Sequence, residues 1–191
     1  MKINKPSLEE VNRVDLSELF PLFRFFPGVV NGDKNYLDQP AGIEHYKLLG
    51  WLSKKFDNCI ISEIGTCDGM GLLALSLNKS NSVISYDIMD YSQKHDVPSN
   101  GERVLCNKDF NFFDEIIKSK LIFYDAGHGG KEFDYQGIVV FDDINLNNEM
   151  KNFWSELKSS EIYTEDWTDV GHYEGTGLVF FNKKIVKNNE L

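Results

Sequence analysis

The chain has 191 residues, enough for one domain with a sizeable core and too few for two. Twenty basic and thirty acidic residues give a formal net charge of −10, and no run of Lys or Arg forms a basic stripe. A nucleic-acid-binding protein needs clustered cations to neutralise phosphates, so the composition argues against nucleic acid as a partner.

The three cysteines, Cys59, Cys67 and Cys106, form neither a CxxC pair nor a His/Cys pattern with metal-ligand spacing. Such a sparse, odd set indicates reduced thiols rather than a disulfide framework. The N-terminal segment is polar, and no apolar run is long enough to cross a bilayer. We therefore expect a soluble, cytoplasmic protein with no membrane partner. The sequence leaves a homodimer open.

Two regions are expected. Residues 1–41 form an N-terminal lead-in with several turn formers, and its aromatic stretch Phe20–Phe26 is a candidate lid over the site. Residues 42–191 form a single folded domain, in which short apolar runs alternate with amphipathic segments. This alternation predicts βα units around a largely parallel sheet.

The apolar pattern predicts the elements in chain order. The expected helices are Gly42–Phe56, Gly69–Leu77, a stripe through Phe110, Phe113, Ile116 and Ile117, and Met150–Leu157. The expected strands are Cys59–Gly65, Val83–Asp90, Arg103–Cys106, Leu121–Ala126, Gly137–Asp143, Ile162–Trp167 and Gly177–Asn182. Together they predict an α/β fold with a doubly wound, mostly parallel, seven-stranded Rossmann-like sheet and a C-terminal antiparallel hairpin. The short link Gly127–Gln136 leaves room only for a loop or a single turn.

Acidic residues stand at the carboxyl ends of four of these strands: Glu63, Asp87, Asp125 and the pair Asp142-Asp143. In an open α/β sheet, ligands bind in the crevice beyond those ends. One acid after a strand is usually a helix cap or a turn former. Acidic residues at four equivalent strand ends predict a binding site at this edge.

The segment Glu63–Gly71, EIGTCDGMG, joins the first strand to the next helix. Gly65 and Gly69 would let the backbone turn tightly and approach a ligand closely. The dinucleotide fingerprint G-x-G-x-x-G fails at positions 67 and 70, and there is no P-loop. Asp87 stands where a carboxylate accepts hydrogen bonds from ribose hydroxyls. These features predict a pocket for an adenosine-containing cofactor; a tight turn that binds nothing is the alternative.

The run EIGTCDGMGLLALS resembles motif I of class I S-adenosylmethionine-dependent methyltransferases, in the form typical of small-molecule O-methyltransferases, with Leu72 near the place of a serine. LIFYDAGHGG, GIVVFDDIN and GHYEGTGLVFF resemble later motifs of that superfamily, over roughly residues 42–183. The resemblance implies the fold and the methyl donor S-adenosylmethionine, and it does not identify the acceptor. The cofactor-binding residues that it implies are Glu63, Gly65, Thr66, Gly69, Asp87 and Asp109.

Asp125, Asp142 and Asp143 follow neighbouring strands, so their carboxylates are expected to meet and to need a proton or a cation between them. An oxygen-only ligand set suits Mg²⁺ or another divalent cation. The resemblance to metal-dependent O-methyltransferases implies such a cation, although Asn145 stands two residues later than the family's usual asparagine. The alternative is that one acid contacts the substrate and the others cap helices or turns.

The candidate catalytic residues are Asp125, whose counterpart in the family faces the active centre, and two loop histidines, His128 and His172, which lie among glycines. A loop histidine is more often structural than a general base. His45 and His95 have weaker cases as catalytic groups.

We therefore expect an S-adenosylmethionine-dependent methyltransferase that acts on a small molecule at a hydroxyl oxygen. Two alternatives remain open. One is a nucleotide-sugar-dependent glycosyltransferase that uses Asp142-Asp143 for a metal-bound diphosphate, although no Arg/Lys set is placed to bind a diphosphate. The other is a methyltransferase fold kept as a non-catalytic binding module, which is favoured by the two shortened crossovers, Gly127–Gln136 and the link between the second and third strands.

Overall fold

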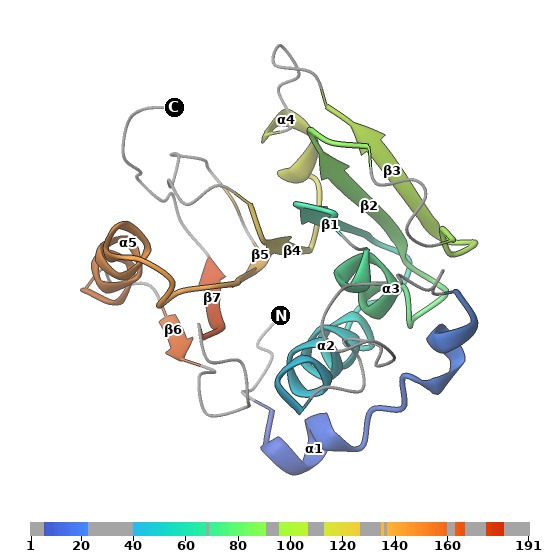
Figure 1. Cartoon of the computed structure of the whole chain (residues 1–191), viewed down its shortest axis with the longest axis horizontal. Helices are drawn as coiled ribbons and strands as arrows, with labels where there is room; N and C mark the ends of the chain where they lie inside the picture. Colours follow the sequence, from blue (N-terminus) through green and yellow to red (C-terminus); the bar gives the residue numbers. More distant parts are fainter. Residues whose placement is uncertain are drawn as a thin grey trace, which may run out of the picture.

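A computed structural model of the chain describes residues 6–22, 40–67, 69–90, 96–106, 113–126, 135, 137–159, 163–166 and 175–181. Seven strands of this part form one sheet, in the order β3-β2-β1-β4-β5-β7-β6 (Figure 1). The strands are β1 (Ile60–Ile64), β2 (Ser82–Asp87), β3 (Gly101–Leu105), β4 (Leu121–Tyr124), β5 (Gly137–Phe141), β6 (Tyr163–Asp166) and β7 (Gly177–Phe181).

Strands β1 to β5 pair in parallel, and β7 pairs antiparallel with both β5 and β6. The predicted α/β fold, with a mostly parallel sheet and an antiparallel C-terminal pair, is confirmed. The order turns back at β1, because β2 and β3 lie on one side of it and β4 and β5 on the other. In open parallel sheets this switch point is where a crevice for a ligand opens.

The described helices are α1 (Leu8–Asn12), the 3-10 helix η1 (Ser17–Leu22), α2 (Pro40–Ser53), α3 (Met70–Leu75), α4 (Phe113–Ile116) and α5 (Asn148–Ser159). Ser7 caps α1 in a capping box with Glu10, so two backbone donors at the helix start are satisfied. Val11, Val14 and Leu19 are buried in the same core as α2 and α3. The described part of the lead-in therefore packs onto the domain.

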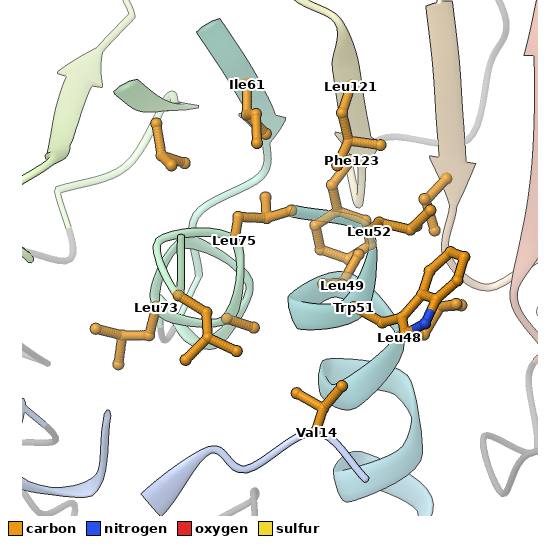
Figure 2. Close-up of a cluster of buried hydrophobic side chains, with 14 of the residues drawn as sticks. Val14, Leu48, Leu49, Trp51, Leu52, Ile61, Leu73, Leu75, Leu121 and Phe123 are labelled. Atoms are coloured by element: carbon orange, nitrogen blue, oxygen red, sulfur yellow. The ribbon is translucent and has the colours of Figure 1, made fainter. Parts of the chain in front are cut away.

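Helices cover both faces of the sheet. Successive side chains of a strand point to opposite faces, and on each face they join a separate apolar cluster with helical residues. On one face, α2 and α3 pack against Ile61 of β1 and against Leu121 and Phe123 of β4 (Figure 2). On the other face, Met150, Trp154 and Leu157 of α5 join Ile116 of α4 and the alternate strand residues Ile122, Val139 and Val179. Burial on both faces explains why β4 and β5 are nearly continuous apolar runs.

Two strands end earlier than predicted at the edge that carries the acids. The fifth strand was expected to reach Asp143, but β5 ends at Phe141, and Asp143 has a φ of 55°, in the left-handed region. The second strand was expected to reach Asp90, but β2 ends at Asp87. Only the last part of the expected Phe110–Ile117 helix lies among the described residues, as α4.

Two further expectations fall largely outside the described residues. Of the link Gly127–Gln136, only Tyr135 is described, so the predicted loop crossover is not tested. Residues 20–22 of the candidate lid belong to η1, and residues 23–26 lie outside the described part. Among the described helices, none combines the length and the apolar character needed to span a membrane.

Candidate active site

The strand-end acids lie on four adjacent strands. Glu63 is near the end of β1, Asp87 is the last residue of β2, Asp125 follows β4, and Asp142-Asp143 follow β5. Because β2, β1, β4 and β5 are neighbours and run parallel, these residues share one edge of the sheet. The loop between β1 and α3 lies at this same edge.

Glycine is required at the first turn of that loop. Gly65 has a φ of +92°, and a Cβ on it would overlap the carbonyl oxygen of Asp125. Gly69 has a φ of +78° at the start of α3, and its N–H donates to the carbonyl of Thr66 at 2.6 Å. The loop can therefore lie against the end of β4 only because Gly65 carries no side chain.

Asp87 holds the loop. Its Oδ2 accepts hydrogen bonds from the backbone N–H of Thr66 at 2.8 Å and from that of Cys67 at 3.1 Å. Its Oδ1 accepts from the N–H of Met89 at 2.9 Å. Cys67 has a φ of 41°, which is an uncommon backbone conformation for a residue other than glycine. In this conformation its N–H points to the Asp87 carboxylate. The predicted ribose-binding acid and the predicted cofactor loop are thus one hydrogen-bonded unit.

Glu63 lies beneath this loop, with only 1% of its surface exposed. Its carboxylate accepts hydrogen bonds from the Ser85 hydroxyl and from the backbone N–H of Leu72. The Ser85 hydroxyl also bonds to Thr66 Oγ1 at 2.6 Å. Burial raises the pKa of Glu63 to about 8, against the lowering effect of the Ser85 hydrogen bond. Glu63 was expected to contact the cofactor, and in this structure it supports the loop from beneath.

Asp125, Asp142 and Asp143 form an acid cluster, each partly buried, in which one carboxylate oxygen per residue lies within 4.8 Å of the others. Burial raises the pKa of Asp125 well above its usual range, and the charges of Asp142 and Glu63 raise it further. Three converging carboxylates at this spacing, with ionisation of one of them disfavoured, fit a hard divalent cation. The structure thus brings together the three acids that were expected to meet.

A histidine from outside the strand ends reaches this cluster. His45 of α2 is 3% exposed, and its Nδ1 lies 2.9 Å from Thr176 Oγ1 and 3.8 Å from Asp142 Oδ1. Sequence reasoning ranked His45 below the loop histidines. The position of His45 in the helix could have indicated that it is buried. It shares the buried face of α2 with Leu48, Leu49 and Leu52.

Tyr46, the next residue of α2, also faces the acids. Burial raises the pKa of its hydroxyl well above the usual range, and the nearby charges of Asp125, Asp142 and Glu63 raise it further. The middle of α2 therefore brings His45 and Tyr46 close to the acid cluster. Three predicted site residues, Asp109, His128 and His172, lie outside the described residues.

The structure was compared with known proteins. No family model and no curated protein matches the sequence. A candidate caffeoyl-CoA O-methyltransferase from Staphylococcus aureus is similar in structure over 92% of each chain, with a TM-score of 0.54 and 13% sequence identity. An S-adenosylmethionine-dependent O-methyltransferase from Thermotoga maritima is similar over 97% of this chain and 74% of its own, with a TM-score of 0.52 and 11% identity. The chain therefore has the fold of S-adenosylmethionine-dependent O-methyltransferases.

Proposed function

We propose that this protein is an S-adenosylmethionine-dependent methyltransferase that methylates a hydroxyl oxygen of a small molecule with the help of a divalent cation. The observation that carries the proposal is the joint arrangement of Asp87 with the backbone of Thr66 and Cys67, near the acid cluster that follows β4 and β5. The first part is suited to an adenosyl group, and the second to activation of an oxygen nucleophile.

The surroundings of Asp87 support an adenosyl ligand. Asp87 is paired with Leu105 in the β2–β3 ladder, and Ile88 follows it in the chain. Leu105 is 63% exposed and Ile88 is 78% exposed, so apolar surface flanks the carboxylate at the sheet edge. The flat face of an adenine ring would cover this surface while its ribose lies beside Asp87.

Methyl transfer requires the protein mainly to orient the donor and the acceptor. The acceptor oxygen forms a bond to the methyl carbon while the carbon–sulfur bond breaks, and S-adenosylhomocysteine leaves with the electron pair on sulfur. The acceptor proton must go to a base. A carboxylate beside the donor favours a cationic sulfonium over a neutral compound, and Asp87 supplies such a group at this edge.

Asp125, Asp142 and Asp143 would hold the cation, which when bound supplies Lewis-acid lowering of the pKa of the acceptor hydroxyl. Burial and the charges of Asp142 and Glu63 raise the pKa of Asp125, and a cation bound between the acids would relieve this repulsion. His128 and His172 remain predicted bases. A small-molecule acceptor fits a site built from strand ends and a tight loop.

Isothermal titration calorimetry with S-adenosylmethionine, S-adenosylhomocysteine and UDP-sugars tests the proposal. We expect both adenosyl compounds to bind and the UDP-sugars to give no heat. Binding of a UDP-sugar without a response to either adenosyl compound would overturn the proposal in favour of glycosyl transfer. Cofactor binding without turnover against a panel of hydroxylated metabolites, with and without Mg²⁺, would instead favour a non-catalytic binding module.

A further inference from the structure

The contacts of His45 fix the orientation of its ring. It is 3% exposed, and the ring centroids of Tyr46 and Phe123 lie 5.0 Å and 5.2 Å from its own, with Tyr46 edge-on. Nδ1 lies 2.9 Å from Thr176 Oγ1. With its proton on Nδ1, the imidazole donates this hydrogen bond to the hydroxyl. A ring packed by two aromatics and tied by one hydrogen bond has little freedom to turn.

Thr176 belongs to the junction where β7 begins beside the end of β5. Phe141 pairs with Gly177, and the N–H of Ile144 donates to the carbonyl of Gly175 at 3.1 Å. Asp142 and Asp143 lie between these two ties, directly after the end of β5, and Thr176 lies between them directly before β7. The backbone on both sides of the two acids is therefore bonded to the segment that leads into β7. The hydrogen bond from His45 of α2 to Thr176 fixes that segment in turn.

The same nitrogen of His45 faces Asp142, with Nδ1 at 3.8 Å from Oδ1. This distance is too long for a hydrogen bond, so His45 reaches Asp142 through its position and through Thr176 rather than by direct donation. His45 and Asp142 are both largely shielded, with 3% and 11% of their side chains exposed. Water therefore does little to screen the imidazole from the carboxylate.

We propose that His45 is a positioning residue for Asp142, which it keeps in the orientation that meets Asp125 and Asp143. The inference rests on the proposed function, because it gives His45 the support of a cation ligand. Removal of a residue that supports a metal ligand lowers metal affinity by about 10–100-fold in characterised metalloenzymes, without removing a ligand. The Thr176 hydroxyl should belong to the same unit.

The test is Mn²⁺ binding to the full chain, followed by electron paramagnetic resonance, together with S-adenosylhomocysteine binding by calorimetry. His45→Leu keeps an apolar side chain of similar size but removes the donor, and we expect Mn²⁺ affinity to fall by about 10–100-fold. His45→Asn places an amide N–H near the position of Nδ1, and we expect it to restore most of the affinity. Thr176→Val, which is nearly isosteric, should weaken Mn²⁺ binding in the same direction. Affinity for S-adenosylhomocysteine should change little in all three variants.

Leu48→Val is the matched control, because Leu48 is fully buried on the same face of α2, one turn beyond His45. It should lower thermal stability and leave Mn²⁺ affinity unchanged. Equal loss of Mn²⁺ affinity in Leu48→Val and His45→Leu would reduce His45 to a packing residue and overturn the inference, as would unchanged affinity in His45→Leu. If His45→Leu does not fold, His45→Asn and Thr176→Val decide the same question.

Failure of the proposed function gives different results. A wild-type chain that binds S-adenosylhomocysteine but no Mn²⁺ overturns the cation site, and this role of His45 with it, while the methyl donor stands. A wild-type chain that binds Mn²⁺ but neither adenosyl compound overturns the methyltransferase proposal. In that case the comparison of His45→Leu with His45→Asn still tests whether His45 positions Asp142.

Discussion

The backbone N–H of Thr66 donates a 2.8 Å hydrogen bond to Oδ2 of Asp87, so the acid at the end of β2 holds the loop at the end of β1. Thr66 Oγ1 also bonds to the hydroxyl of Ser85, which donates to the buried Glu63. The loop is therefore tied to two carboxylates, one at the sheet edge and one beneath it. This arrangement leads to four predictions.

Asp87→Ala should weaken binding of S-adenosylhomocysteine by about 10–100-fold, the loss expected for hydrogen bonds to a charged group. The physical reason is twofold, because the variant loses an acceptor for the ribose hydroxyls and releases the N–H groups of Thr66 and Cys67. Calorimetric titration measures the change. Asp114→Ala removes the same charge from the exposed first turn of α4 and should bind like wild type. Wild-type affinity in Asp87→Ala would contradict the assigned cofactor site.

Glu63→Gln should change how stability depends on pH. The pKa of Glu63 is about 8 in the folded chain against an ordinary value of 4.5, so the unfolded chain loses this proton first as pH rises. Wild-type stability should therefore fall between pH 4.5 and about 8, and this residue should contribute no further slope above that range. Glutamine is neutral throughout, so the variant should gain on wild type across this window by a few kcal/mol, at about 1.4 kcal/mol per pKa unit. Urea unfolding at a series of pH values measures the difference. Parallel curves for the two proteins would show that Glu63 is ionised in the native state.

Gly65→Ala should destabilise the chain and impair cofactor binding. The left-handed φ of +92° alone costs a side chain about 1–2 kcal/mol, and the new Cβ would also overlap the carbonyl of Asp125. Gly101→Ala is the matched control, because its added Cβ would meet only side-chain atoms, at 3.2 Å or more. Thermal unfolding should show a clearly smaller loss for Gly101→Ala, and only Gly65→Ala should weaken S-adenosylhomocysteine binding. Equal losses in both would mean that the loop accommodates a side chain.

Asp125→Asn and Asp142→Asn should each abolish cation binding and turnover and leave cofactor affinity nearly intact. At a concentration 100 times its Kd, Mg²⁺ or Mn²⁺ should stabilise the wild-type chain by about 2.7 kcal/mol. For a chain of this size, that corresponds to a rise in Tm of roughly 2–4 °C per kcal/mol. The two variants should show no such rise. Full methyl-transfer activity in excess EDTA would rule out the metal.

Much of the fold could be predicted because its strands are covered on both faces. Runs such as Leu121–Tyr124 and Gly137–Phe141 must be almost continuously apolar to lie between two helical layers, and this property can be read from the local sequence. The parallel direction of successive βα units then places Glu63, Asp87, Asp125 and Asp142 at one edge. The boundaries were less predictable: the left-handed φ of Asp143 ends β5 two residues early, and no apolar pattern encodes that turn.

The residues themselves therefore determined the class of fold, the edge that carries the acids and the glycines of the first loop, because each follows from local pattern and chain direction. The tertiary structure alone decided which of these groups meet. Asp125 approaches Asp142 and Asp143 because β4 and β5 are neighbours, and His45 bonds to Thr176 across 131 residues of sequence because α2 packs over the start of β7. The pKa of Glu63 likewise depends on the side chains that bury it. Contacts between distant segments, and the loss of water that they cause, arise only when the whole sheet is assembled.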